Sequence, residues 1–208
     1  MVKKSIWISA LLALFFLAVM TLVLTDALAG FESWVYQLLQ QTVSPPMTAV
    51  MKIASWLGNP SILALISLAL LLLPATRVQY ATRLVPSVAV AGLFNQILKR
   101  VFQRQRPGVI AMIHESGFSF PSGHSMGSAA IGAALVIAAC RIQQRWPRRI
   151  LCGLGVLFPL FVGISRIYVG VHYAGDVLGG WSLGVLTAIL ICALRDQIAK
   201  AERLMDSK

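Results

Sequence analysis

Long runs of hydrophobic residues, separated by short polar segments, dominate the pattern along this chain. The first run, Ser5 to Thr25, contains no charged residue in 21 positions. At about 1.5 Å per residue, a helix of this length is roughly 30 Å long, which matches the hydrocarbon core of a bilayer. Five further runs follow, so the pattern predicts an all-α, polytopic membrane protein with six transmembrane helices. Their approximate bounds are Ser5–Thr25, Ser61–Thr76, Tyr80–Phe102, Ser122–Arg141, Ile150–Tyr168 and Asp176–Arg195.

The first hydrophobic run has a second interpretation, a signal peptide that is removed after secretion. Lys3 and Lys4 form a basic start, and Ala27-Leu28-Ala29 before Gly30 resembles a cleavage site. The run is nevertheless longer than the roughly 7 to 15 apolar residues typical of signal peptides. We therefore expect this segment to be retained as a transmembrane helix.

The stretch between the first two runs mixes apolar and polar residues. From Phe31 to Gln41, apolar side chains recur at helical spacing beside glutamines, which predicts a short amphipathic helix at the membrane interface. Pro45-Pro46 ends this helix, and Met47–Leu57 is either a second short helix or an early start of the next span, which Asn59-Pro60 would kink or delay. No repeat or long linker divides the chain, so residues 1–208 are expected to form one membrane domain.

Composition supports the membrane interpretation. Hydrophobic residues make up 58% of the chain and charged residues only 12%, whereas soluble domains are about a quarter charged. A soluble enzyme, a disordered chain and a disulfide-rich scaffold are therefore all disfavoured. The formal net charge of +11 leaves three interpretations open at this stage: lipid headgroups, a phosphorylated substrate, or topology alone.

The basic residues are distributed unevenly over the two sides that six alternating spans define. Twelve of the 18 fall on the side of both termini, which the positive-inside rule assigns to the cytoplasm. Cys140, Cys152 and Cys192 lie near the same side and are expected to be reduced thiols. The opposite, outer side carries the other six basic residues, which are Lys52, Lys99, Arg100, Arg104, Arg106 and Arg166.

Three clusters of polar residues are expected at this outer face. Ionisable groups at the ends of membrane helices are costly to dehydrate, so such clusters indicate a functional site. The clusters are Lys99-x6-Arg106-Pro107, Pro121-Ser122-Gly123-His124 and Ser165-Arg166-x5-His172-x3-Asp176.

The cations and the helix start in these clusters predict an anion site. Lys99, Arg106 and Arg166 supply positively charged donors, and an arginine fork suits phosphate oxygens. Ser122 and Gly123 stand where a loop enters a helix, so free backbone amides and the helix dipole would point at the same anion.

The histidines predict what happens to that anion. If the segment from His172 to Asp176 is helical, the carboxylate lies beside the imidazole and orients it as a nucleophile. His124 is placed to act as general acid. Taken alone, each of these features more often sets the membrane topology or stabilises the packing than marks a functional site. A metal site of His114, His124, His172 and Asp176 is the rival, but three neighbouring cations would repel a divalent ion.

At these residues the sequence resembles the type 2 phosphatidic acid phosphatase superfamily, whose three-part signature it matches in order and spacing. The run from His114 to Phe120 is most similar to bacterial phosphatidylglycerophosphatase B-type and undecaprenyl pyrophosphate phosphatase-like enzymes. The resemblance implies a metal-independent enzyme without cofactors in the bacterial cytoplasmic (inner) membrane, working through a phosphohistidine, with its site at the periplasmic or outer face. It makes His172 the nucleophile, Asp176 its partner and His124 the acid. It assigns phosphate binding to Lys99, Arg106, Ser122, Gly123 and Arg166.

The expected reaction is hydrolysis of a lipid phosphate or pyrophosphate, with undecaprenyl pyrophosphate as the first candidate and phosphatidylglycerophosphate or phosphatidic acid as the second. A lipid phosphotransferase, or a transporter or scaffold that binds an anion without chemistry, are alternatives from other classes. The expected partners are the lipid substrate and the bilayer, and no nucleic acid; the oligomeric state is left open. Arg100, Arg104, His114 and Glu115 lie outside the signature and are candidate headgroup contacts.

Overall fold

The structure, a computed structural model, describes residues 2–72, 80–109 and 111–206, and no strand occurs within these ranges. Its helices are α1 (Val2–Leu24), α2 (Ala29–Gln40), α3 (Pro45–Leu57), α4 (Pro60–Leu72), α6 (Thr82–Phe102), α7 (Gly123–Ala139), α8 (Arg145–Tyr168) and α9 (Ala174–Asp206). The prediction of an all-helical protein is confirmed for the part of the chain that the structure describes.

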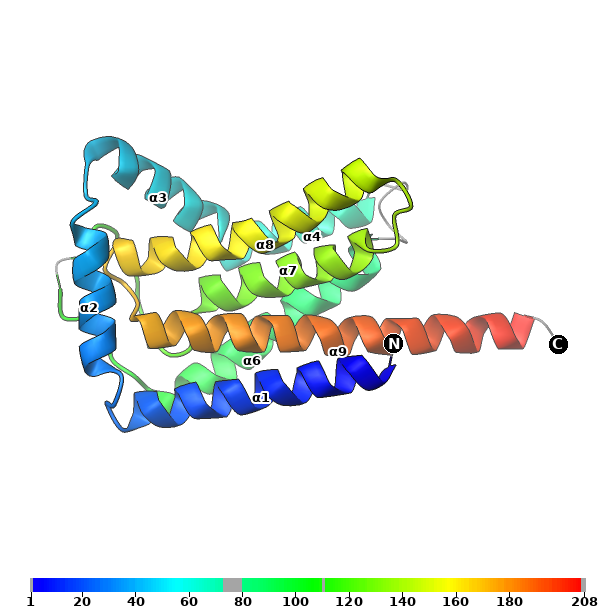
Figure 1. Cartoon of the computed structure of the whole chain (residues 1–208), viewed down its shortest axis with the longest axis horizontal. Coiled ribbons are helices and arrows are strands. Elements are labelled where there is room, and N and C mark those ends of the chain that lie inside the picture. Colours follow the sequence, from blue (N-terminus) through cyan, green and yellow to red (C-terminus); the bar gives the residue numbers. More distant parts are fainter. Residues whose placement is uncertain (1, 73–79, 110, 207–208) are drawn as a thin grey trace.

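Helix α7 lies at the centre, and α6, α8 and α9 pack around it (Figure 1). Small residues allow this close packing. A Cβ at Gly180 of α9 would lie 2.7 Å from the Ser122 carbonyl oxygen, and one at Gly155 of α8 would lie 2.6 Å from that of Gly132 on α7. The backbones of α7, α8 and α9 therefore approach one another without intervening side chains, which fixes the relative positions of their ends.

Helix α1 is part of this bundle and runs along α9 (Figure 1). Its side chains Phe16, Val19 and Val23 are buried in one cluster with Phe120, and the rings of Phe16 and Phe120 stack 6.0 Å apart. Loss of α1 would therefore expose this cluster.

The predicted spans coincide with helices, but their number as membrane spans is not established. By length and hydropathy, α1, α8 and α9 could each cross a bilayer, and α3 with α4 could form a fourth span bent by 57°. Helix α7 has only 17 residues, and α6 carries Arg83, Lys99 and Arg100. The end of the second predicted span, residues 73–76, lies outside the described residues.

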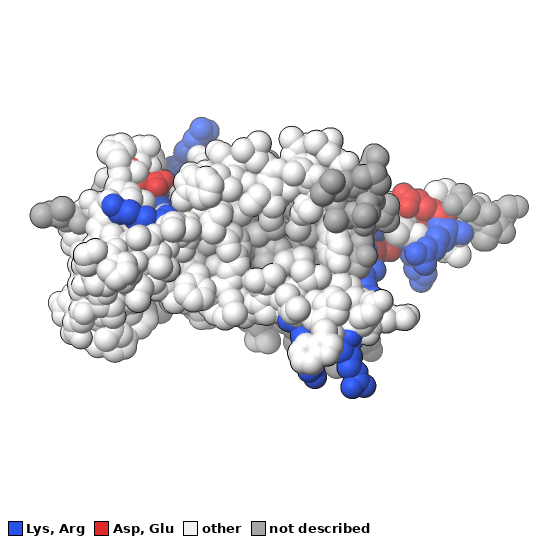
Figure 2. Space-filling model, turned by 90° about the horizontal axis from the view of Figure 1, so that it is seen from above, with Lys and Arg blue, Asp and Glu red and all other residues white. Residues whose placement is uncertain are grey.

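Helix α2 forms where the amphipathic segment is predicted and lies across one end of the bundle (Figure 1). Phe31, Trp34 and Leu38 are exposed, whereas Val35 and Leu39 pack against a core cluster with Ile167. Exposed apolar side chains continue along α1, α3, α4 and α8. In Figure 2 the middle of the visible face is free of Asp, Glu, Lys and Arg, as expected for a surface in contact with lipid chains.

Candidate active site

The three polar clusters meet at the end of the bundle that α2 covers. This end combines the end of α6, the start of α7, the end of α8 and the loop that leads into α9. Arg106 Nη1 of the first cluster lies 3.2 Å from His172 Nε2 of the third, and the Ser122 amide of the second donates to the Asp176 carbonyl oxygen over 3.0 Å. Residues far apart in the sequence are therefore brought into one site.

His172 and Asp176 are paired, although not through the expected helix. His172 precedes α9, which begins at Ala174, so the condition of a helix that runs from His172 to Asp176 is not met. Asp176 instead lies in the first turn, where its Oδ2 accepts hydrogen bonds from the Tyr173 amide (2.9 Å) and from His172 Nδ1 (3.2 Å). The carboxylate thus caps α9 and fixes the imidazole with Nε2 facing away from it.

Two further side chains hold Asp176, and neither was assigned a catalytic role from the sequence. Ser119 Oγ donates to Asp176 Oδ2 and also lies 3.2 Å from His172 Nδ1. Arg104 Nη1 donates to Asp176 Oδ1 over 2.8 Å. Asp176 is fully buried and both of its oxygens are occupied, so its orientation is strongly determined.

The environment of His172 favours the neutral ring. Burial lowers the pKa of His172 to about 4, although the hydrogen bond and charge of Asp176 act in the opposite direction. Its Nε2 lies 3.2 Å from Arg106 Nη1. Because guanidinium has no acceptor, the contact requires a lone pair on Nε2, which is the tautomer that a nucleophile needs.

Arg106 is held mostly by backbone carbonyls. Its Nε donates to the Gly117 oxygen, Nη1 to the Val171 oxygen and Nη2 to the Ser116 oxygen, each over 2.9 Å. With the contact to His172, four of its five N–H groups are engaged. Arg106 therefore fixes the loop around Gly117 against the segment that carries the histidine.

Arg166 is the more deeply buried cation, with only 1% of its surface exposed. It donates to Ser55 Oγ on α3 and to Glu115 Oε2. Within the described residues its Nε is buried without a hydrogen-bond partner. A buried, unsatisfied donor costs about 1–3 kcal/mol, and an anion entering the site would satisfy it.

Glu115 places a carboxylate between two of the predicted phosphate-binding arginines. It pairs with Arg166, and Arg106 Nη2 lies 3.8 Å from Glu115 Oε1. Burial alone would raise the pKa of Glu115, but the two arginines hold it below its ordinary value. The ionised carboxylate would therefore compete with any other anion for these two arginines.

Lys99 and the start of α7 offer donors that remain unused. In the part of the chain that the structure describes, the Lys99 ammonium has no ion-pair or hydrogen-bond partner, and neither do the amides of Gly123 and His124. Ser122 is already engaged, since its amide donates to the Asp176 carbonyl oxygen and its hydroxyl caps α7 by accepting from the Ser125 amide. The free amides lie where a helix N-terminus attracts anions.

Asn95 on α6 supports this helix start and was missed from the sequence. Its Nδ2 donates to the Pro121 oxygen over 2.9 Å, and its Oδ1 lies 2.9 Å from where a Cβ at Gly123 would stand. Glycine is required at position 123 because Asn95 fills the space. Nothing in the sequence pattern separates Asn95 from an ordinary polar residue on a helix.

The remaining candidates divide into two groups. Arg104 and Glu115 belong to the buried networks described above, whereas Arg100 and His114 are exposed. Among the described residues, no group of three or more His, Cys, Asp or Glu side chains is arranged to hold a metal ion. The rival set His114, His124, His172 and Asp176 is therefore not assembled as a metal site.

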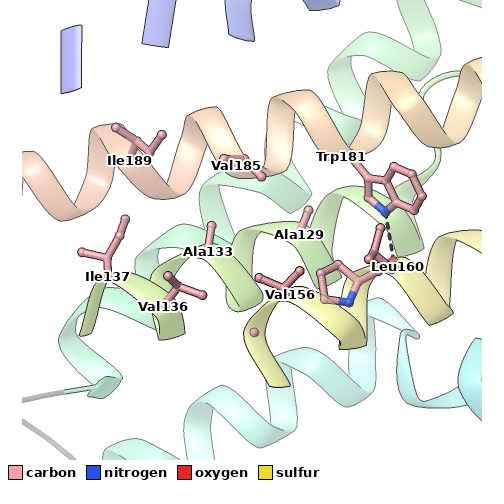
Figure 3. A pocket seen from close by; sticks show the side chains of 11 residues that line it. Ala129, Ala133, Val136, Ile137, Val156, Leu160, Trp181, Val185 and Ile189 are labelled. Atoms are coloured by element: carbon pink, nitrogen blue, oxygen red, sulfur yellow. Dashed lines mark hydrogen bonds between the residues drawn. The ribbon is translucent and has the colours of Figure 1, made fainter. Parts of the chain in front are cut away.

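An apolar groove of about 420 Å³ lies on the side of the bundle between α7, α8 and α9 (Figure 3). It begins at Ala129, about 7 Å along α7 from His124 at 1.5 Å per residue. The one indole N–H in its lining, that of Trp181, donates to the Pro159 oxygen over 2.9 Å. The groove offers no reactive group, so the chemistry belongs to the polar end of the bundle.

The chain is similar to known proteins in both sequence and structure. A family model described as PAP2 superfamily matches residues 80–199, which contain all three clusters. The crystal structure of a transmembrane PAP2 type phosphatidylglycerolphosphate phosphatase from Bacillus subtilis is similar, with a TM-score of 0.77 and 29% identity over 91% of this chain and 96% of that one.

Two curated relatives share sequence with the chain to different extents. Phosphatidylglycerophosphatase B from Bacillus subtilis is 40% identical over 52% of this chain and 54% of its own length, so the alignment spans about half of that relative. An undecaprenyl-diphosphatase from Sulfolobus acidocaldarius is 25% identical over 98% of both chains.

Proposed function

Because the chain belongs to the PAP2 superfamily, we propose that it is a membrane enzyme that hydrolyses lipid phosphates through a phosphohistidine on His172. The observation that carries this proposal is the geometry of His172, whose Nδ1 is held by Asp176 and whose Nε2 faces Arg106. Nucleophile, orienting carboxylate and cationic donors are the components that phosphoryl transfer to an imidazole requires.

In the first step, Nε2 of neutral His172 attacks the phosphorus of the substrate. The bond from phosphorus to the leaving oxygen breaks, and that oxygen takes a proton from His124. The imidazole ring becomes cationic as the P–N bond forms, and Asp176 stabilises this charge through Nδ1–H. Lys99, Arg106, Arg166 and the first amides of α7 bind the equatorial phosphate oxygens.

In the second step, water attacks the phosphohistidine and passes a proton to His124, which now acts as base. The P–N bond breaks, inorganic phosphate leaves, and His172 returns to its neutral form. Entry of the substrate phosphate displaces Glu115 from the arginines, since the two anions compete for the same donors. No metal takes part in this scheme, so EDTA is expected to leave turnover unchanged.

We propose the six-span topology for this enzyme, with α1, α4, α6, α7, α8 and α9 as spans and α2 at the interface. The polar residues of α6 and α7 lie at the ends of these helices or face the site. Polar groups in membrane proteins are usually found in such places. The excess of positive charge on the opposite side supports a topology with both termini in the cytoplasm of a bacterial inner membrane and the site at its outer face.

The proposed substrate is undecaprenyl diphosphate, supported by the end-to-end similarity to a relative with that name. Phosphatidylglycerophosphate is the second candidate, supported by the higher identity of a shorter alignment and by the structural match. Both lipids end in a phosphate and carry apolar chains, so the cations of the site bind the common group and the lipid-facing surface accepts the rest.

A lipid panel tests this proposal. Purified wild type and His172→Ala are incubated with undecaprenyl diphosphate, phosphatidylglycerophosphate and phosphatidic acid, and phosphate release is measured. We expect release by wild type with a preference for the diphosphate, and a loss of at least about 10³-fold in the variant. Undiminished activity of His172→Ala would remove the proposed nucleophile, and release only in the presence of a lipid acceptor would indicate a phosphotransferase.

A further inference from the structure

We propose that Glu32, on the interfacial helix α2, is a positioning residue for the reaction: through Arg104 it sets the charge and orientation of Asp176. This inference rests on the proposed function, because it concerns the nucleophile of that reaction. Glu32 lies outside the three clusters, Arg104 is one of the unassigned positions between Lys99 and Arg106, and the mechanism above uses neither.

The bridge consists of two carboxylates joined by one guanidinium. Arg104 Nη2 lies 2.7 Å from Glu32 Oε2, and Arg104 Nη1 donates to both Glu32 Oε1 (3.0 Å) and Asp176 Oδ1 (2.8 Å). Glu32 is only 4% exposed and Asp176 is fully buried. A buried carboxylate is costly without a partner, so this arrangement requires all three groups together.

The first turn of α9 contacts Glu32 directly. The amide of Gly175, in the first turn of α9, donates to Glu32 Oε1 over 3.1 Å. A Cβ at position 175 would lie 2.6 Å from the same oxygen. Glu32 therefore contacts the turn that carries Asp176 directly as well as through Arg104.

Arg104 is itself confined on its other face. Its guanidinium lies 4.2 Å from the centre of the Tyr173 ring, and Tyr173 follows His172 in the chain. Burial alone would lower the pKa of Arg104, but its hydrogen bonds and charge interactions with Glu32 and Asp176 raise it above its ordinary value. The guanidinium thus stays charged and fixed between the two carboxylates.

The charge balance explains why a second carboxylate is needed. Arg104 with Asp176 alone would have no net charge, and the dyad would offer little to the cation that forms on His172 during attack. With Glu32 the three groups carry a net charge of −1, which stabilises that cation in a buried site. Arg104 can then orient Asp176 without neutralising it.

A double-mutant cycle tests this role, using Glu32→Gln, Arg104→Gln and the combination of both, with Glu202→Gln as control. Glu202 is an exposed carboxylate that pairs with Arg195 far along α9, 3.6 Å away. Wild type and His172→Ala are measured alongside on the best lipid of the panel. Melting temperatures in the same detergent show whether each variant is folded.

We expect Glu32→Gln to lower kcat by about 10- to 100-fold with KM near the wild-type value, because the nucleophile and not phosphate binding is affected. Arg104→Gln leaves two unbalanced buried carboxylates and is expected to be worse. In the double variant the bridge again carries a net charge of −1, from Asp176, so its kcat should exceed that of Arg104→Gln. The control should retain wild-type kcat.

Two results would overturn the inference while leaving the proposed function in place. One is a wild-type kcat in Glu32→Gln while His172→Ala is inactive. The other is a double variant whose losses simply add, since the two residues would then act independently, or whose kcat falls only in step with its melting temperature, since the bridge would then be only structural. If wild type itself releases no phosphate from any lipid, the proposed function fails instead.

Discussion

Both ends of the helix bundle contain an ionic network centred on an aspartate of α9, but the two networks are built in opposite ways. At the α2 end, Arg104 joins Asp176 to Glu32, so one cation serves two carboxylates. At the other end, Asp196 accepts from Arg83 of α6 over 3.0 Å and also from Arg141 beyond α7. There one carboxylate serves two cations.

The two networks differ in the side chains that lie beside each aspartate. Both oxygens of Asp196 are paired, and none of the three histidines of the chain is near it in sequence or at that end of the bundle. Asp176, by contrast, holds the imidazole of His172, and the cations Arg106 and Arg166 lie at the same end of the bundle. Buried charge alone therefore does not identify a candidate site; the α2 end differs in having an imidazole that a carboxylate orients, with cations beside it.

Of the substitutions that compare the two ends of the bundle, the one that removes the Arg166 Nε donor is expected to have the largest effect. In Arg166→Lys the positive charge remains, but an ammonium group cannot reach Ser55 and Glu115 together and still offer a third N–H to phosphate. We expect kcat/KM to fall by about 10²-fold or more. Steady-state hydrolysis of the preferred lipid measures this, with circular dichroism to confirm that the helices are intact.

Glu115→Gln is the matched control for this substitution. If Arg166 acted only as the partner of Glu115, the two variants would lose the same activity. We expect instead that Glu115→Gln lowers KM, because it removes the anion that competes with phosphate for the arginines. Equal losses in both variants would assign Arg166 to structure and make the two ends of the bundle alike.

A second prediction concerns the protonation of His172. Burial lowers the pKa of His172 to about 4, so the ring is neutral above that pH and takes up a proton only as the pH falls through it. The nucleophile should therefore be available from pH 5 to 8, whereas an unperturbed histidine would be half protonated near 6.5. The terminal phosphate of the substrate also changes its protonation state, near pH 6. The His172 ring must therefore be observed directly.

NMR of protein labelled at its three histidines provides that observation, and His172→Ala identifies the resonance. We expect the His172 signal to move only near pH 4, with Asp176, Arg106 and Arg166 as the charged groups that act on it. A midpoint near 6.5 would show that the ring is not shielded in solution, and the site would then differ less from the opposite end.

The positions of the helices were accessible from the sequence because the hydrophobic runs are long and continuous. The three clusters could be predicted because Lys99, His124 and Asp176 lie at the ends of those runs. The helix boundaries were harder to predict. Helix α9 begins at Ala174, so the His172–Asp176 contact depends on a capping turn and not on helical periodicity. A capping turn leaves no periodic signal in the sequence.

The supporting residues could not be found from one sequence for a different reason. Glu32 is one acid in an amphipathic helix, Ser119 one hydroxyl in a loop and Asn95 one amide on a long helix. Each becomes informative only when the fold places it beside a residue more than 20 positions away, as in the contacts Glu32–Arg104, Ser119–Asp176 and Asn95–Pro121. Contacts between distant segments are set by packing, which the local pattern does not encode.

The smallest effect is expected at the opposite end, where Asp196→Asn removes the shared carboxylate. Asp196 is 37% exposed, so water screens its ion pairs and the loss of stability should be about 1 kcal/mol. For a chain of this size that corresponds to about 2–4 °C in Tm. Because Asp196 lies about 30 Å along α9 from Asp176 at 1.5 Å per residue, kcat and KM should stay at their wild-type values. A loss of kcat comparable to that of Glu32→Gln would mean that the two networks are coupled through α9, and the separation of a structural end from a reactive end would be wrong.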